Sequence, residues 1–280
     1  MSEQSLGERL AVCSWSLQPA DPADLIGQMQ QLGMDQIQLG LDPLRADEKW
    51  ADAPAQLAEA GITVVSGMFG CEGEDYSTLE SIRRTGGIVP DETWETNWAN
   101  IQRTVPIAES LGLNLVSFHA GFLPEAPDDP SYERLVDRLT RIADAFADRG
   151  IDLAFETGQE DAATLKGFLD RLGRPNIGVN FDPANMILYA KGEPVESVKV
   201  LMGYLKSVHV KDATPSGAPG EWGTEVVVGT GAVNWPGFFA ALEAGGFAGY
   251  LCIEREGGDD RVGNIRQARD FVLETLGKVG

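Results

Sequence analysis

Short apolar segments alternate with longer amphipathic segments along almost the whole chain. Within each apolar segment, successive side chains change between apolar and polar or small, which is the two-residue period of a β-strand. The amphipathic segments carry apolar residues at helical spacing, and several of them end at a glycine, as helices commonly do. The pattern predicts eight strand–helix pairs, with strands at 10–17, 36–41, 63–69, 115–121, 152–158, 177–183, 207–213 and 251–257.

Regular alternation of strand and helix is typical of a parallel sheet, because each helix carries the chain back to the start of the next strand. Eight such units in 280 residues favour closure into a (β/α)8 barrel, with residues 1–280 as a single domain. The alternative is an open, doubly wound sheet. That fold usually has a glycine-rich loop after its first strand, whereas residues 14–25 read SWSLQPADPADL.

Two insertions follow strand ends. Residues 70–97 are predicted to form an extended loop after the third strand, and residues 213–234 a short hairpin after the seventh. Both should lie over the rim where barrel enzymes bind substrate. They are interpreted as a lid, or else as surface decoration or an oligomer contact. The side chains considered for a lid are Tyr76, Arg83, Arg84, Trp94 and Trp222.

Four residues with metal-ligand chemistry end the last four predicted strands, all in the same strand phase. They are Glu156 in DLAFETG, Asp182 in IGVNFDP, His209 in SVHVKDA and Glu254 in LCIEREG. If these strands are neighbours in one barrel, the four side chains point inward at the same rim. A single glutamate at a strand end is usually a solvated rim residue, but four in phase predict a divalent-cation site.

Three carboxylates and one imidazole suit Mn²⁺, Mg²⁺, Co²⁺ or Fe²⁺ better than a thiolate-rich zinc site. Such an ion can hold a carbonyl oxygen and a neighbouring hydroxyl, which acidifies the C–H beside the carbonyl by stabilising the enediolate. Glu156 and Glu254 would then move the proton. This chemistry is compatible with epimerisation, aldose–ketose isomerisation and dehydration.

The composition of the chain limits the classes of molecule that it is expected to bind. The formal net charge is −21, from 22 basic and 43 acidic residues, so the surface repels nucleic acid and anionic membranes. Three cysteines without a CxxC pair are typical of reduced thiols, and the N-terminal tract lacks the apolar core of a signal peptide. With no stretch long enough to span a bilayer, we expect a cytoplasmic protein that acts on a small molecule.

The motifs FET (155–157), FDPAN (181–185), HVKD (209–212) and IERE (253–256) stand in this order at the ends of successive strands. With them the chain resembles the sugar phosphate isomerase/epimerase superfamily of xylose isomerase-like barrels. It is most similar to the ketose 3-epimerases and the inosose isomerases and dehydratases. The resemblance implies one divalent metal, most often Mn²⁺ with Mg²⁺, Co²⁺, Fe²⁺ or Zn²⁺ as alternatives. Its ligands would be Glu156, Asp182, His209 and Glu254, and relatives often form dimers or tetramers.

The resemblance also implies how substrate is held. His119 matches a position that usually faces the substrate, and Lys211 is in phase with His209, where it either contacts substrate or pairs with a carboxylate. Ketose 3-epimerases commonly have a histidine where this chain has Asn185 and an arginine where it has Pro215. These departures leave open which sugar is bound. We keep Asn185, His119 and Lys211 as the expected substrate-binding residues.

We therefore predict a metal-dependent isomerase or epimerase of a ketose or related polyhydroxy ketone, with Glu156 and Glu254 as the acid/base pair. A lyase or dehydratase acting on an inosose or a 3-keto-glycoside would use the same site. A non-catalytic sugar-binding barrel is a further alternative, while two histidines and the net charge argue against an apurinic-site endonuclease. Beside the site, Trp15 is expected to pack in the core or at the rim, Asp212 to be structural and Glu256 to be solvated.

Overall fold

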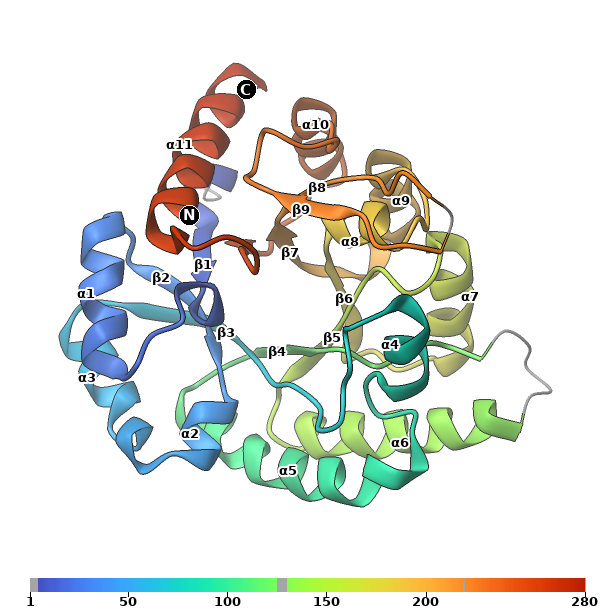
Figure 1. The fold of residues 1–280 in the computed structure, drawn as a ribbon. Coiled ribbons are helices and arrows are strands. Elements are labelled where there is room, and N and C mark those ends of the chain that lie inside the picture. The colour runs from blue at the N-terminus through green and yellow to red at the C-terminus, as the bar shows by residue number, and fades with distance from the viewer. Residues whose placement is uncertain (1–4, 125–129, 219, 280) are drawn as a thin grey trace.

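Eight parallel strands close into a barrel with the order β1-β10-β7-β6-β5-β4-β3-β2, which confirms the predicted (β/α)8 fold (Figure 1). The computed structural model describes residues 5–124, 130–218 and 220–279. Every barrel strand pairs in parallel with both neighbours, as is expected when each connection is a helix. The strands are β1 Leu10–Cys13, β2 Gln36–Gly40, β3 Thr63–Met68, β4 Leu115–Phe118, β5 Asp152–Glu156, β6 Ile177–Phe181, β7 Leu205–Val210 and β10 Leu251–Ile253.

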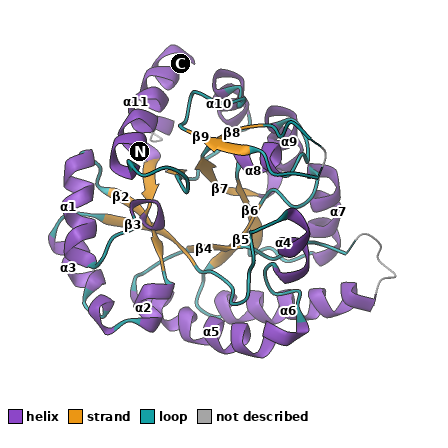
Figure 2. Ribbon diagram, viewed as in Figure 1, coloured by secondary structure: helices purple, strands orange, loops and turns teal. Residues whose placement is uncertain are grey.

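Helices form an outer ring around the barrel (Figure 2). The first shows why they form where they do: the Asp21 carboxylate accepts the N–H of Asp24, Pro22 occupies the first turn, and Gly33 ends the helix at a φ of 65°. Among the described residues, no helix is long and apolar enough to cross a membrane. The ring comprises α1 Pro22–Leu32, α3 Ala53–Glu59, α5 Asp91–Ser110, α6 Pro130–Ala147, α7 Ala162–Leu172, α9 Pro194–Leu201, α10 Trp235–Ala244 and α11 Arg261–Val279.

Shorter helical segments lie in the connections, and two of them correct the sequence prediction. The first strand ends at Cys13 instead of residue 17, because the chain then turns into the 3-10 helix η2. The segment 70–97 is not one extended loop: Thr78 caps α4, and α5 already begins at Asp91, directly after Pro90. The short helices are η1 Leu6–Arg9, η2 Ser14–Leu17, α2 Asp42–Ala46, η3 Glu48–Trp50, α4 Leu79–Thr85, α8 Pro183–Leu188 and η4 Met202–Tyr204.

The hairpin predicted after the seventh strand is present as β8 Asp212–Thr214 paired antiparallel with β9 Thr224–Val226. Residue 219, inside the predicted segment, lies outside the described residues. The buried carboxylate of Asp212 organises the return to α10: it accepts the N–H groups of Gly229, Gly231 and Val233 and the indole N–H of Trp235. Asp212 is therefore structural, as expected.

The main hydrophobic core lies between the barrel and the helices. Phe69 and Phe118 stack with ring centroids 4.8 Å apart, and Phe146 of α6 lies 6.2 Å from Phe69. Because apolar side chains such as Phe155 must face this layer, the alternate residues of each strand, such as Glu156, face the barrel axis. Burial of the helix-facing side chains thus fixes the inward direction of the polar ones.

Candidate active site

Glu156, Asp182, His209 and Glu254 come together at the C-terminal mouth of the barrel. All four are buried, and potential ligand atoms of the four lie within 4.8 Å of one another. Glu156 ends β5, Asp182 follows β6, His209 is near the end of β7 and Glu254 follows β10. The convergence predicted from the strand phase is therefore what the structure contains.

The donor set fits a divalent cation. Asp182 is the N-cap of α8, and its Oδ1 accepts hydrogen bonds from the N–H groups of Ala184 and Asn185. Its Oδ2 is therefore directed at the cluster. That oxygen is buried and has no hydrogen-bond partner among the described residues; Lys211 Nζ lies 3.4 Å away. Burial raises the pKa of Asp182 to about 7, against the opposing charge of Lys211. A cation placed among these carboxylates would offset that cost.

His209 presents one ring nitrogen to the carboxylates and the other to Gln38. Its Nδ1 lies 3.3 Å from both Glu156 Oε1 and Glu254 Oε2, while Nε2 lies 2.8 Å from Gln38 Oε1. Ser117 orients the Gln38 amide, because its Oγ accepts a hydrogen bond from Gln38 Nε2 at 3.0 Å. With the carbonyl of Gln38 facing the ring, Nε2–H donates, so the neutral imidazole would have its lone pair on Nδ1, toward the carboxylates and a metal.

Electrostatics at His209 favour positive charge. Burial lowers the pKa of the imidazole, but Glu254 and other nearby acidic groups raise it more, so the net pKa lies well above its usual value. The same carboxylates that hold a proton on the ring would attract a metal ion in its place.

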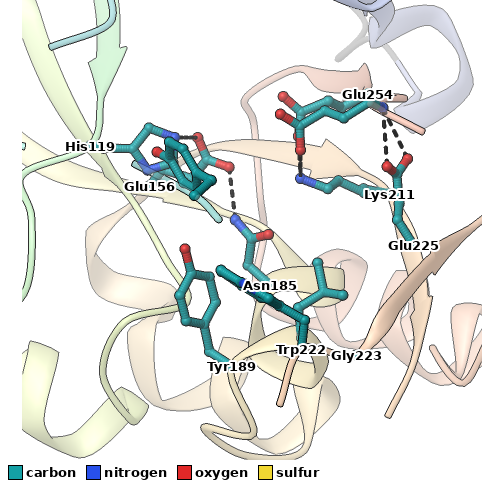
Figure 3. A pocket seen from close by; sticks show the side chains of 12 residues that line it. His119, Glu156, Asn185, Tyr189, Lys211, Trp222, Gly223, Glu225 and Glu254 are labelled. Carbon is teal, nitrogen blue, oxygen red and sulfur yellow. Dashed lines mark hydrogen bonds and ion pairs between the residues drawn. The ribbon is translucent and has the colours of Figure 1, made fainter. Parts of the chain in front are cut away.

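Glu156 is held by the two flanking residues that were expected to bind substrate. His119 Nε2 lies 3.2 Å from Glu156 Oε2, and Asn185 Nδ2 donates to Glu156 Oε1 at 3.0 Å (Figure 3). Burial raises the pKa of Glu156, but the two histidines beside it lower it more, and the net shift is downward. Both His119 and Asn185 also line the cavity, so each can touch a ligand as well as orient the carboxylate.

Glu254 is held from both sides. Lys211 Nζ lies 3.0 Å from Glu254 Oε2, and the indole N–H of Trp15 donates to Glu254 Oε1 at 2.7 Å. Burial raises the pKa of Glu254, but His209 and Lys211 lower it more, so the net pKa lies well below its usual value. Lys211 Nζ also pairs with Glu256 Oε2 at 2.5 Å. The Glu256 side chain is 57% exposed, as expected for a solvated residue, but it also belongs to the ion-pair network.

Trp15 lies at the rim, one of the two positions expected for it, but the direction of its indole does not follow from the sequence pattern. A strand continued to residue 17 would turn this side chain toward the helices. The chain instead leaves the extended conformation after Cys13, and η2 turns the indole toward the barrel axis, 5.9 Å from the His209 ring. No periodic signal marks such a turn, although the end of a barrel strand is where the change of direction is to be expected.

A cavity of about 320 Å³ opens above the cluster. Tyr76 from the insertion after β3 and Trp222, Gly223 and Glu225 from the β8–β9 hairpin line it, so both insertions reach the mouth as predicted. Trp94 does not: it is buried at the ring of helices, where the Arg138 guanidinium lies 4.8 Å from its ring. The size suits a ligand of a few hundred daltons at most.

Comparison with known proteins agrees with the fold. The model of the xylose isomerase-like TIM barrel family matches residues 26–275, and the chain belongs to that family. A xylose isomerase domain protein from Planctomyces limnophilus superposes with a TM-score of 0.87 at 29% identity, covering 100% of this chain and 99% of the other. An L-ribulose 3-epimerase has a similar fold, with a TM-score of 0.75 at 19% identity over 97% and 95% of the two chains.

A curated relative is an inosose dehydratase of Geobacillus thermodenitrificans (strain NG80-2). It is 20% identical over 169 residues, which are 53% of this chain and 56% of the dehydratase. The chain thus spans little more than half the length of this relative. Epimerases and dehydratases are among the proteins that share the fold of this chain or part of its sequence.

Proposed function

We propose that the protein is a divalent-metal-dependent isomerase or epimerase that acts on a ketose or a related polyhydroxy ketone. The observation that carries this proposal is the placement of two buried carboxylates, Glu156 and Glu254, each 3.3 Å from His209 Nδ1 at the floor of a small cavity. Two carboxyl groups on either side of one position can serve as the base that removes a proton from carbon and the acid that returns one.

Glu156, Asp182, His209 and Glu254 would hold the metal, with Mn²⁺ expected first among the divalent ions. When bound, such an ion supplies positive charge beside the carbonyl and hydroxyl oxygens of the substrate, which makes the neighbouring C–H more acidic. Three carboxylate oxygens and one imidazole nitrogen are ligands that these ions share.

The protein's own residues account for the proton transfers. One glutamate removes the proton from the carbon beside the carbonyl, and the C–H electron pair becomes the carbon–carbon π bond of an enediolate. The other glutamate starts the turnover protonated and returns its own proton to the opposite face of that carbon for epimerisation. For isomerisation the proton goes to the neighbouring carbon, while the hydroxyl proton passes from one enediolate oxygen to the other. Asn185 and His119 fix the direction of Glu156, while Trp15 and Lys211 fix that of Glu254.

A dehydratase or other lyase is the second candidate, favoured by the similarity to the inosose dehydratase. It would begin with the same proton abstraction, after which the enediolate expels a hydroxide or an alkoxide from the next carbon. Lys211, buried beside Glu254, is placed to pair with an oxygen that gains negative charge. Product mass separates the two reactions, because an isomer keeps the substrate's mass and a dehydrated product loses one water.

The first experiment is metal analysis of protein purified without chelator, compared with a Glu156→Ala/Asp182→Ala variant. We expect about one divalent ion per wild-type chain and loss of that ion in the variant. Glu256→Ala is the matched control, because this carboxylate lines the same cavity outside the four-residue cluster. Wild-type protein that takes up no metal after supplementation would refute the metal site. Loaded protein is then screened for exchange of substrate α-protons in D₂O.

A further inference from the structure

A second cavity of about 440 Å³ adjoins the first across the barrel mouth. The two share four lining residues: Tyr76, His119, Glu254 and Glu256. We call the second cavity the outer chamber. It is formed by the segments that follow β1, β2 and β3, on the side of the mouth away from Asp182 and the β8–β9 hairpin.

Aromatic and aliphatic side chains form much of the wall of the outer chamber. Trp15 comes from η2, Pro43 from α2, Trp50 from η3, and Met68 and Phe69 from the end of β3. Such a surface binds a ring or an alkyl group by excluding water from it. Trp15 also donates to Glu254, so the apolar wall begins directly beside the carboxylate proposed for proton transfer.

The charge of the outer chamber disfavours an anion. Its described lining includes the carboxylates of Asp42, Glu74, Glu254 and Glu256 and no Lys or Arg, although Asp42 pairs with Arg45 at 2.8 Å. In the first cavity the cationic side chain is Lys211, whose Nζ already lies within 3.4 Å of three carboxylates. A phosphate or carboxylate on the substrate would meet negative charge in both cavities.

Each cavity alone has the size of a small-ligand site, and both open onto the same pair of groups, His119 and Glu254. A free monosaccharide above the metal cluster would leave the outer chamber to water. A substrate made of two joined units would fill both, with the junction near the reacting carbon.

We propose that the substrate is an uncharged molecule of two joined units, such as a glycoside of a keto-sugar. This proposal rests on the proposed function. The polyhydroxy carbonyl unit of the substrate would occupy the first cavity, and its apolar or aromatic second unit the outer chamber.

The test compares α-proton exchange in D₂O for a free 3-keto-hexose and its phenyl β-glycoside, using metal-loaded protein. We expect kcat/KM to be about tenfold higher or more for the glycoside, because burial of a phenyl ring in the outer chamber adds binding energy. Met68→Trp, which fills that chamber, should reduce the ratio of the two kcat/KM values about tenfold. Leu188→Trp is the matched control, since Leu188 lines the first cavity only, and it should lower both values while keeping their ratio.

The outcomes separate this proposal from the function on which it rests. Exchange with equal kcat/KM for both sugars and a ratio insensitive to Met68→Trp would overturn the two-part substrate and leave the isomerase intact. A phosphorylated keto-hexose that is preferred to both would also overturn it. If neither sugar exchanges, the proposed function fails for these compounds. Saturation-transfer NMR with unreactive phenyl β-glucoside then decides: transfer to the phenyl protons that Met68→Trp abolishes supports the chamber, and transfer that persists refutes it.

Discussion

The two sides of the barrel mouth are built differently. On the side of β5, β6, β7 and β10, buried charged residues project directly from strand ends and hold one another in place. On the side of β1, β2 and β3, the wall is formed by side chains of η2, α2 and η3, and it is largely apolar with carboxylates at its margin. In the function proposed above, the first side supplies the groups for proton transfer and the second side the surface that selects the substrate.

This difference teaches how the fold divides its tasks. Strand ends are fixed by the hydrogen bonds of the barrel, so they can hold charged atoms within a few tenths of an ångström. Connections after strands are free to vary in length and direction, which makes them suited to shaping a chamber. Three residues outside the charged side nevertheless contact its cluster: Trp15 of η2, Gln38 of β2, and His119 directly after β4.

Glu254→Gln should have the largest effect of the changes considered. The amide cannot accept a proton from carbon, so we expect kcat to fall at least about a thousandfold, or about 4 kcal/mol in the barrier. The variant should fold normally, because glutamine fills the same volume. Steady-state turnover at saturating metal, with metal content measured on the same sample, checks this expectation.

Glu256→Gln is the matched control for that change. Its carboxylate contacts the same lysine but is 57% exposed and lies outside the cluster, so turnover should fall by less than about tenfold. Equal losses of turnover in the two variants would mean that the acidic residues act only through their combined negative charge. Glu254 would then have no specific role in proton transfer.

Asp212→Ala should affect stability instead of chemistry. This buried carboxylate of the charged side accepts four backbone N–H groups and the Trp235 indole N–H, and all would lose their partner. We expect a loss of about 3 kcal/mol in the free energy of unfolding, measured by urea denaturation. Glu221→Ala, at an exposed position of the same insertion, should change it by less than about 0.5 kcal/mol. A stable Asp212→Ala protein with no bound metal would assign Asp212 to the site after all.

Gln38→Leu tests whether the opposite side of the barrel tunes the metal site. Leucine keeps most of the volume but removes the oxygen that faces His209 Nε2, so the imidazole is no longer held with Nδ1 toward the carboxylates. We expect Mn²⁺ affinity to fall about 10- to 100-fold, measured by titration of metal-stripped protein. Ser207→Ala is the control, because Ser207 donates to Asn180 inside the same barrel, and its affinity should stay within about threefold. Unchanged affinity in Gln38→Leu would show that packing alone orients the ring.

The same division explains what could be predicted from the sequence. Strand alternation continues to the ends of β5, β6 and β7, so the inward phase of Glu156 and His209 could be predicted, and the barrel with them. Trp15 could not, because the chain stops being extended two residues before it. Gln38 is one of several inward polar residues, and only the closed barrel shows that it faces His209. The outer chamber joins Pro43, Trp50 and Met68 from separate connections, and no local pattern relates them.

Trp15→Phe should have the smallest effect and is the most informative about the boundary between the two sides. Phenylalanine keeps an aromatic wall in the outer chamber but lacks the N–H that donates to Glu254 Oε1 at 2.7 Å. One hydrogen bond to a charged group holds that carboxylate in direction, so we expect kcat to fall about tenfold, which is about 1.4 kcal/mol, with little change in KM. Trp15→Ala removes the wall as well and should add an increase in KM for the phenyl glycoside used above. If Trp15→Phe and Trp15→Ala lower kcat equally and KM is unchanged in both, Trp15 serves only Glu254, and the outer chamber does not begin at its ring.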